Sequence, residues 1–150
     1  MRVHFATDHA GFELKEELVN FVANDLGYEV VDHGAKELDP TDDYPDYVAE
    51  AAAAVAAAGK DGRGIVIGKS GQGEAMAANR FPGVRAMVYY SAPLEVAILS
   101  REHNDSNVLS LGAGFISTEE AKTVVQRWLA TDFSGDERHV RRNQKLDKLN

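Results

Sequence analysis

Short apolar runs alternate with longer helical stretches along the chain. Five of the short runs are mostly rich in valine or isoleucine, at residues 2–6, 28–32, 64–68, 85–90 and 107–112. Such runs are typical of buried strands in a parallel sheet. Helices are expected between and after them, near residues 11–25, 45–58, 73–80, 92–102, 118–130 and 137–148. The alternation predicts a Rossmann-like, three-layer α/β/α fold with one five-stranded parallel sheet.

Helix-end signals agree with this division of the chain. Pro45 suits a first helical turn, Gly59 suits a stop after the alanine-rich run, and residues 117–121 begin like a capping box. We find no repeat or linker in the sequence. Residues 1–150 are therefore expected to form a single domain.

Composition narrows the classes of function. The net charge of −8 argues against a nucleic-acid surface, and it means that any anionic ligand must be held by a local cluster of positive groups. The chain has no cysteine, so a disulfide, a thiolate metal site and a cysteine nucleophile are all excluded. Its first residues are not those of a signal peptide, and no window is apolar enough to span a membrane. We expect a cytoplasmic protein that acts neither on nucleic acid nor at a membrane.

A glycine-rich turn follows the third predicted strand. In "GKSGQGE", residues 68–74, the backbone N–H groups of Gly71 and Gly73 can point at one anionic oxygen. The stretch matches neither the P-loop nor the dinucleotide fingerprint. The glycines could simply allow a tight turn, and Glu74 could simply favour the helix dipole. A carboxylate beside such N–H groups is also what proton abstraction next to a carbonyl requires.

Three other segments carry candidate chemistry. Asp8 and His9 follow the first strand, where Asp8 could alternatively be only a helix N-cap. His103 and Asn104 stand at a predicted helix end, where an imidazole is favourable in any case. Near the C-terminus, Arg138 and Arg142 lie one helical turn apart and could grip a phosphate, although a solvated basic helix is the common alternative.

Together these motifs resemble the type B ribose-5-phosphate isomerase family, which includes galactose-6-phosphate and allose-6-phosphate isomerases. The resemblance covers nearly the whole chain. It rests on "DHAGFELK" (8–15), "DYPDY" (43–47), "GIVIGKSGQGEAMAANRFPGVRA" (64–86), "REHNDSNVLSLG" (101–112) and "RHVRR" (138–142), in the order and spacing of the family.

The resemblance implies a sugar-phosphate aldose–ketose isomerase and assigns roles within it. One branch of the family uses a cysteine base at the position of Gly68. The other has glycine there and uses a glutamate at the start of the next helix, which is Glu74 in this chain. Ser70 and the N–H groups of Gly71 and Gly73 would then stabilise an enediolate, and His103 would assist ring opening.

The resemblance also implies the substrate-binding residues and the assembly. Arg138 and Arg142 match a phosphate grip that reaches into a neighbouring subunit's site, so a homodimer or tetramer is expected. No metal or organic cofactor is expected. The full set of substrate-binding candidates is Asp8, His9, Tyr44, Gly68, Lys69, Gly71, Gln72, Gly73, Asn104, Arg138 and Arg142.

Two departures from the family pattern bear on the substrate. The family usually has a phosphate-binding arginine where this chain has Gly114, and glycine where it has Lys69. One cation is lost and one is gained at the same end of the sheet. We expect ribose 5-phosphate as substrate. The alternatives are a four- or six-carbon sugar phosphate, a non-catalytic sugar-phosphate binding protein, and a flavodoxin-like domain, for which we find no flavin-binding loop.

Overall fold

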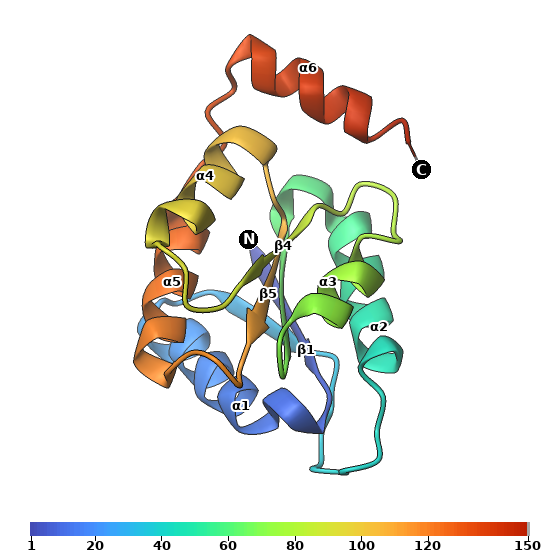
Figure 1. Cartoon of the computed structure of the whole chain (residues 1–150), viewed down its shortest axis with the longest axis vertical. Helices are drawn as coiled ribbons and strands as arrows, with labels where there is room; N and C mark the ends of the chain where they lie inside the picture. The colour runs from blue at the N-terminus through green and yellow to red at the C-terminus, as the bar shows by residue number, and fades with distance from the viewer. Residues whose placement is uncertain (150) are drawn as a thin grey trace.

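Five parallel strands form the centre of the protein, in the order β2-β1-β3-β5-β4. The computed structural model describes residues 1–149, and Figure 1 shows the arrangement. The strands are β1 (Arg2–Thr7), β2 (Glu29–Asp32), β3 (Gly62–Gly68), β4 (Ala86–Tyr89) and β5 (Val108–Gly112). The predicted five-stranded parallel sheet is confirmed.

Helices cover both faces of this sheet. On one face lie α1 (Phe12–Asn20), α4 (Leu94–Asn104) and α5 (Thr118–Ala130), and on the other lie α2 (Tyr44–Ala58) and α3 (Gln72–Ala78). Short helical turns are η1 (His9–Gly11), η2 (Phe21–Asp25), which prolongs α1, and η3 (Gly59–Asp61). The last helix, α6 (Glu137–Leu146), stands apart from both layers, across the upper end of the molecule in Figure 1.

Alternation along the strands divides the core in two. Ile65 and Ile67 of β3 point to the face covered by α1, α4 and α5, where the fully buried Trp128 of α5 also packs. Val66 points to the other face, where it packs with Val48 and Val55 of α2. A strand buried on both faces reads as a continuous apolar run, which is why periodicity alone identified these strands.

The predicted helix ends agree with the structure within a few residues. The hydroxyl of Ser117 accepts a hydrogen bond from the N–H of Glu120 at 3.2 Å, as a capping residue should. Pro45 lies in the first turn of α2, and Gly59 ends that helix with a φ of 57°. The predicted last helix was two residues too long, because α6 ends at Leu146.

The candidate site residues lie at two opposite edges of the sheet. The carboxyl ends of β1 and β3 lead directly to Asp8 and to the glycine turn before α3. The amino ends of β4 and β5 lie beside the end of α4, over which α6 is placed (Figure 1). Among the described residues, no helix is both long and apolar enough to cross a membrane.

Candidate active site

Glu74 is a buried carboxylate at the carboxyl end of β3. It belongs to the first turn of α3, and it is only 5% exposed. Its side chain lies directly over Gly68, the last residue of β3. A Cβ atom built on Gly68 would come within 1.8 Å of Glu74 Oε1 and 2.1 Å of its Cδ. The carboxylate therefore occupies the space that any side chain at position 68 would need.

Burial changes the acidity of Glu74. Desolvation raises the pKa of the carboxyl above its ordinary value, and the negative charge of Asp8 raises it further. The N–H of Glu74 itself acts in the opposite direction but does not cancel these effects. A carboxylate whose pKa is shifted toward neutrality is better suited to accept and return a proton at physiological pH.

The glycine turn before α3 is fixed by close backbone contacts. Gly71 has a φ of 75°, a left-handed conformation that favours glycine, and its carbonyl accepts a hydrogen bond from Ser110 Oγ of β5 at 2.6 Å. Gly73 has no room for a side chain, since a Cβ there would lie 2.6 Å from the hydroxyl of Tyr44. Tyr44 thus packs on the turn that carries Ser70 and Glu74.

The side chain of Ser70 lies inside the turn. Its Oγ accepts a long hydrogen bond, 3.4 Å, from the N–H of Gln72, whose own side chain is exposed. The first N–H groups of α3, including that of Gly73, have no carbonyl partner within the helix. The turn therefore presents a hydroxyl and backbone N–H groups next to the Glu74 carboxylate, which is the arrangement needed to hold a developing oxyanion.

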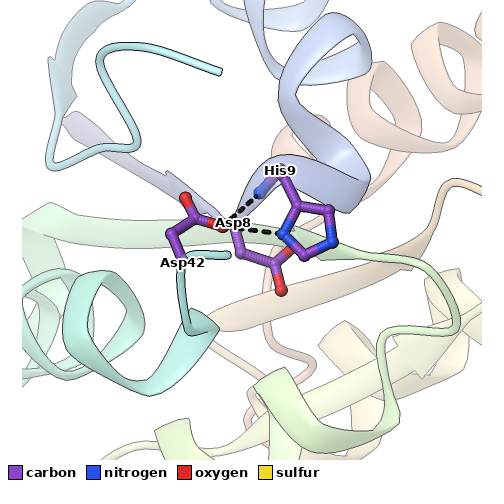
Figure 2. Close-up of side chains that lie close together, drawn as sticks. All are labelled: Asp8, His9 and Asp42. Carbon is purple, nitrogen blue, oxygen red and sulfur yellow. Dashed lines mark hydrogen bonds and ion pairs between the residues drawn. The ribbon is translucent and has the colours of Figure 1, made fainter. Parts of the chain in front are cut away.

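Asp8 and His9 lie at the same edge, after β1. Asp8 is 7% exposed, and its carboxylate accepts a hydrogen bond from the N–H of Ala10 at 2.9 Å, so its capping role is real. Its negative charge also contributes to the raised pKa of Glu74. His9 pairs with Asp42, from the loop that precedes α2 (Figure 2). A cavity of about 750 Å³ borders His9 at this edge.

Asp8, His9 and Asp42 could also be considered as metal ligands. Within residues 1–149 they are the one group of three acidic or histidine side chains whose ligand atoms all lie within 4.8 Å of one another. Nδ1 of His9 is already engaged by Asp42 at 2.7 Å. We interpret the group as a hydrogen-bonded pair beside Asp8, and the expectation of no metal stays a prediction.

The other candidate residues lie at the opposite edge of the sheet. His103 and Asn104 end α4, and the carbonyl of His103 lies 3.1 Å from Nδ1 of His139 on α6. The two imidazole rings lie against each other, with 4.2 Å between their centroids and a tilt of 31° between their planes. Arg138 and Arg142 are exposed on the same helix. They lie one helical turn apart on α6, as predicted, and their role in binding phosphate stays a prediction.

One chain does not bring the two groups of residues together. Glu74, Ser70, Asp8 and His9 follow the carboxyl ends of strands, whereas His103 precedes the amino end of β5. The five residues of β5 separate the two edges by about 15 Å at the rise of a parallel strand. Within one chain, the two groups of candidate residues therefore lie at opposite ends of the sheet.

The ribose/galactose isomerase family matches residues 3–146 of the chain. The chain belongs to this family. It is 43% identical to ribose-5-phosphate isomerase B of Escherichia coli over 148 residues, 99% of this chain and 95% of the relative. The corresponding protein of Mycolicibacterium paratuberculosis is 40% identical over 142 residues, 95% of this chain and 87% of the relative.

Solved structures of the family have the same fold. Ribose-5-phosphate isomerase B of Mycoplasma genitalium, solved with bound ribulose 5-phosphate, superposes with a TM-score of 0.91 at 34% identity, covering 99% of this chain and 95% of that one. The protein of Anaplasma phagocytophilum superposes with a TM-score of 0.88 at 40% identity, covering 97% and 95%.

Within this family, the contact between Gly68 and Glu74 gives a physical reason for the two branches implied by the resemblance. A cysteine at position 68 would occupy the place of the Glu74 carboxylate. A side chain from the strand and a glutamate from the helix cannot both fill that space. The catalytic roles of Glu74 and Ser70 themselves remain predictions.

The two departures from the family pattern lie in contact. Gly114 donates its N–H to the carbonyl of Lys69 at 2.9 Å, and a Cβ at position 114 would lie 3.2 Å from Lys69 Cγ. The stem of Lys69 thus runs over the glycine that replaces the usual arginine, and the Lys69 residue is exposed. The hypothesis that Lys69 compensates for the lost cation stays a prediction.

Sequence reasoning missed the role of two neighbours of the candidate residues. Asp42, the partner of His9, was visible only as the first member of an Asp-Asp pair before Tyr44. His139 was considered, with Arg141, only as a fallback for the missing phosphate-binding cation, yet it is 3% exposed and its ring lies against the end of α4. Both act through contacts between distant parts of the chain, which a single sequence does not reveal.

Proposed function

We propose that this protein interconverts ribose 5-phosphate and ribulose 5-phosphate through an enediolate intermediate. The observation that carries the proposal is the buried carboxylate of Glu74, which has a raised pKa and lies over Gly68 beside the turn of Ser70. The named activity of the relatives, and the ribulose 5-phosphate bound to the one from Mycoplasma genitalium, support this choice of substrate.

The reaction follows from these groups. Glu74 takes the proton from C2 of the open-chain aldose, and the electrons of that C–H bond form a C1=C2 double bond. The carbonyl oxygen at C1 becomes negative and is stabilised by Ser70 Oγ and the N–H groups of Gly71 and Gly73. The protonated Glu74 then delivers its proton to C1, while a proton moves from O2 to O1. The net change is an isomerisation with no redox partner.

The second half of the site comes from a partner subunit. We infer a homodimer in which His103 of the partner subunit assists ring opening and Arg138 and Arg142 of the partner subunit bind the phosphate. The support is geometric, because these residues and Glu74 lie at opposite edges of one sheet. Several large apolar side chains are exposed and would be buried by contact with a partner subunit, namely Met76, Tyr90, Val96, Leu99 and Phe115.

A panel of four-, five- and six-carbon sugar phosphates tests the activity. We expect the highest kcat/KM with ribose 5-phosphate, together with exchange of the C2 proton with solvent. A higher kcat/KM with a four- or six-carbon sugar phosphate would change the assigned substrate while keeping the isomerase reaction. Binding without turnover of any sugar would contradict the isomerase and favour a binding protein.

Mixed dimers test the shared site. Glu74→Gln and His103→Ala damage different halves, so each variant should be nearly inactive alone. After joint refolding, random pairing gives one intact site in half of the dimers, or about a quarter of the wild-type activity. Mixtures that stay as inactive as the two separate variants would contradict a site built from two subunits.

A further inference from the structure

His9 is held by Asp42 through two hydrogen bonds to one oxygen. The N–H of His9 donates to Asp42 Oδ1 at 2.9 Å, and Nδ1 of the ring lies 2.7 Å from the same atom. The residues come from different loops, 33 positions apart in the chain. Figure 2 shows both bonds converging on Asp42, with Asp8 directly beside the ring.

Asp42 is itself firmly placed. Its side chain is 6% exposed, whereas that of His9 is 38% exposed. The N–H of Asp42 donates to the carbonyl of Asp39 at 3.2 Å, and Thr41 hydrogen-bonds the Asp39 carboxylate through both its N–H and its hydroxyl. The loop thus presents a fixed carboxylate to a ring that remains open to a ligand.

The burial of Asp42 calls for a partner of opposite charge. Its second oxygen, Oδ2, is buried and has no hydrogen-bond partner within residues 1–149. A buried carboxylate is costly unless a positive group compensates it. Tyr47 also faces Asp42, and the pKa of its hydroxyl is raised by its own burial and by this carboxylate. The imidazole of His9, whose pKa this carboxylate raises, is the group in contact with Asp42 that becomes a cation on protonation.

These contacts determine which part of His9 is available. Nδ1 is engaged, so Nε2 is the ring nitrogen left for a ligand, and in Figure 2 it points away from Asp42. The hydrogen bond to Asp42 raises the pKa of His9; desolvation opposes this rise, and the negative charge of Asp8 adds a smaller contribution to it. A protonated ring donates from Nε2, which suits an anionic or hydroxyl oxygen of a sugar phosphate.

We propose that Asp42 is a positioning residue for substrate binding: it fixes the imidazole of His9 through Nδ1, so that Nε2–H is aimed at an oxygen of the bound sugar phosphate. Asp42 does not touch the substrate. The inference rests on the proposed function, because it takes the sugar phosphate as the ligand. It is independent of the proton transfer, which Glu74 performs.

Kinetics of Asp42→Ala on ribose 5-phosphate test the role. Loss of a hydrogen bond to a charged group is expected to raise KM about tenfold or more, with little change in kcat. Glu37→Gln, which removes a charge from an exposed position of the same loop, is the matched control and should leave KM unchanged. If the wild type is active and Asp42→Ala has the same KM, the inference is overturned and the proposed function stands.

A double-mutant cycle separates positioning from folding. If Asp42 acts through His9, then Asp42→Ala should add almost nothing to the loss already caused by His9→Ala. A loss that adds in full would show that Asp42 supports the loop or the fold rather than the ring, and the inference would be wrong. The cycle remains decisive even if Asp42→Ala lowers stability.

Asp42→Asn tests the charge separately from the shape. The amide still accepts a bond from Nδ1, so KM should stay near normal at acid pH, where the ring is protonated. The groups that face His9 and Asp42 are all acidic or phenolic, namely Asp8, Glu13, Glu16, Glu17, Asp39 and Tyr47. Without the Asp42 charge, the rise of KM at alkaline pH should begin at a lower pH than in the wild type. An identical pH profile would contradict the role of Asp42 as the partner of a protonated ring.

Discussion

Gly68→Ala should damage catalysis without damaging the fold. The added methyl group would lie 1.8 Å from Oε1 of Glu74, while ordinary van der Waals contact begins at 3.4 Å. The nearest carboxylate oxygen must therefore retreat by about 1.6 Å. A misplacement of about 1 Å can cost about 10²-fold in rate, so we expect kcat to fall at least about 10²-fold.

Stability and substrate binding should change much less. The obstructing atoms are the end of a glutamate side chain, which can turn aside, and alanine is intrinsically better in a strand than glycine by roughly 0.5–1 kcal/mol. The thermal unfolding midpoint should therefore remain near that of the wild type. The assay is the initial rate of ribulose 5-phosphate formation, with a thermal unfolding curve recorded on the same preparation.

A second variant decides whether the loss arises at Glu74. In a Glu74→Gln background there is no carboxylate base to displace, so adding Gly68→Ala should cause little further loss of kcat. The reasoning would be refuted by full turnover in Gly68→Ala. It would also be refuted if Gly68→Ala lowered kcat as much in the Glu74→Gln background as it does in the wild type.

Three other perturbations test separate parts of the molecule. Lys69→Ala removes the lysine whose Cγ lies near Gly114 and should raise KM for the phosphorylated sugar about ten- to a hundredfold, more than it lowers kcat. An unchanged KM would make Lys69 a solvent-facing residue. Burial and the neighbouring His33 lower the pKa of His4 from 6.5, so the free energy of unfolding, measured by urea titration at a series of pH values, should fall as the pH drops below 6.5. His4→Gln should lose part of this pH dependence. His103→Ala should slow turnover of cyclic sugar phosphates more than that of an open-chain one, and equal losses would exclude a role confined to ring opening.

The sign of the His4 effect follows from proton uptake. The pKa of His4 is lowered in the folded protein, so the unfolded chain binds more protons between that lowered value and 6.5. The contribution to stability is therefore complete above 6.5 and is lost on acidification. His33 behaves in the same direction, because burial also lowers its pKa. Nδ1 of His4 lies 2.9 Å from Nε2 of His33, so protonating both rings is unfavourable.

The architecture could be predicted from local sequence patterns. Buried parallel strands such as β3 are continuous apolar runs, and the start of α5 has a capping serine that works as expected. The partners within the site could not be predicted in this way. The pairing of His9 with Asp42 depends on how a long loop folds back, and the contact of Gly68 with Glu74 depends on the exact angle between β3 and α3.

The separation of the candidate residues between two edges of the sheet was only partly predictable. The C-terminal arginines were expected to act in a neighbouring subunit on the strength of the family resemblance. The position of His103 at the same edge as Arg138, and away from Glu74, follows from the parallel course of β5 and from the packing of α6 on the end of α4. That packing involves the buried His139, which no local pattern distinguished from an exposed helix residue.

The central claim is that Glu74 carries the proton between C2 and C1. Its most direct test is the turnover of Glu74→Gln, measured together with the exchange of the substrate C2 proton in deuterated water. The account predicts that sugar-phosphate binding and the unfolding midpoint persist, while turnover and exchange fall in parallel by about 10²- to 10⁴-fold. Near-normal turnover or exchange in this variant would contradict the account.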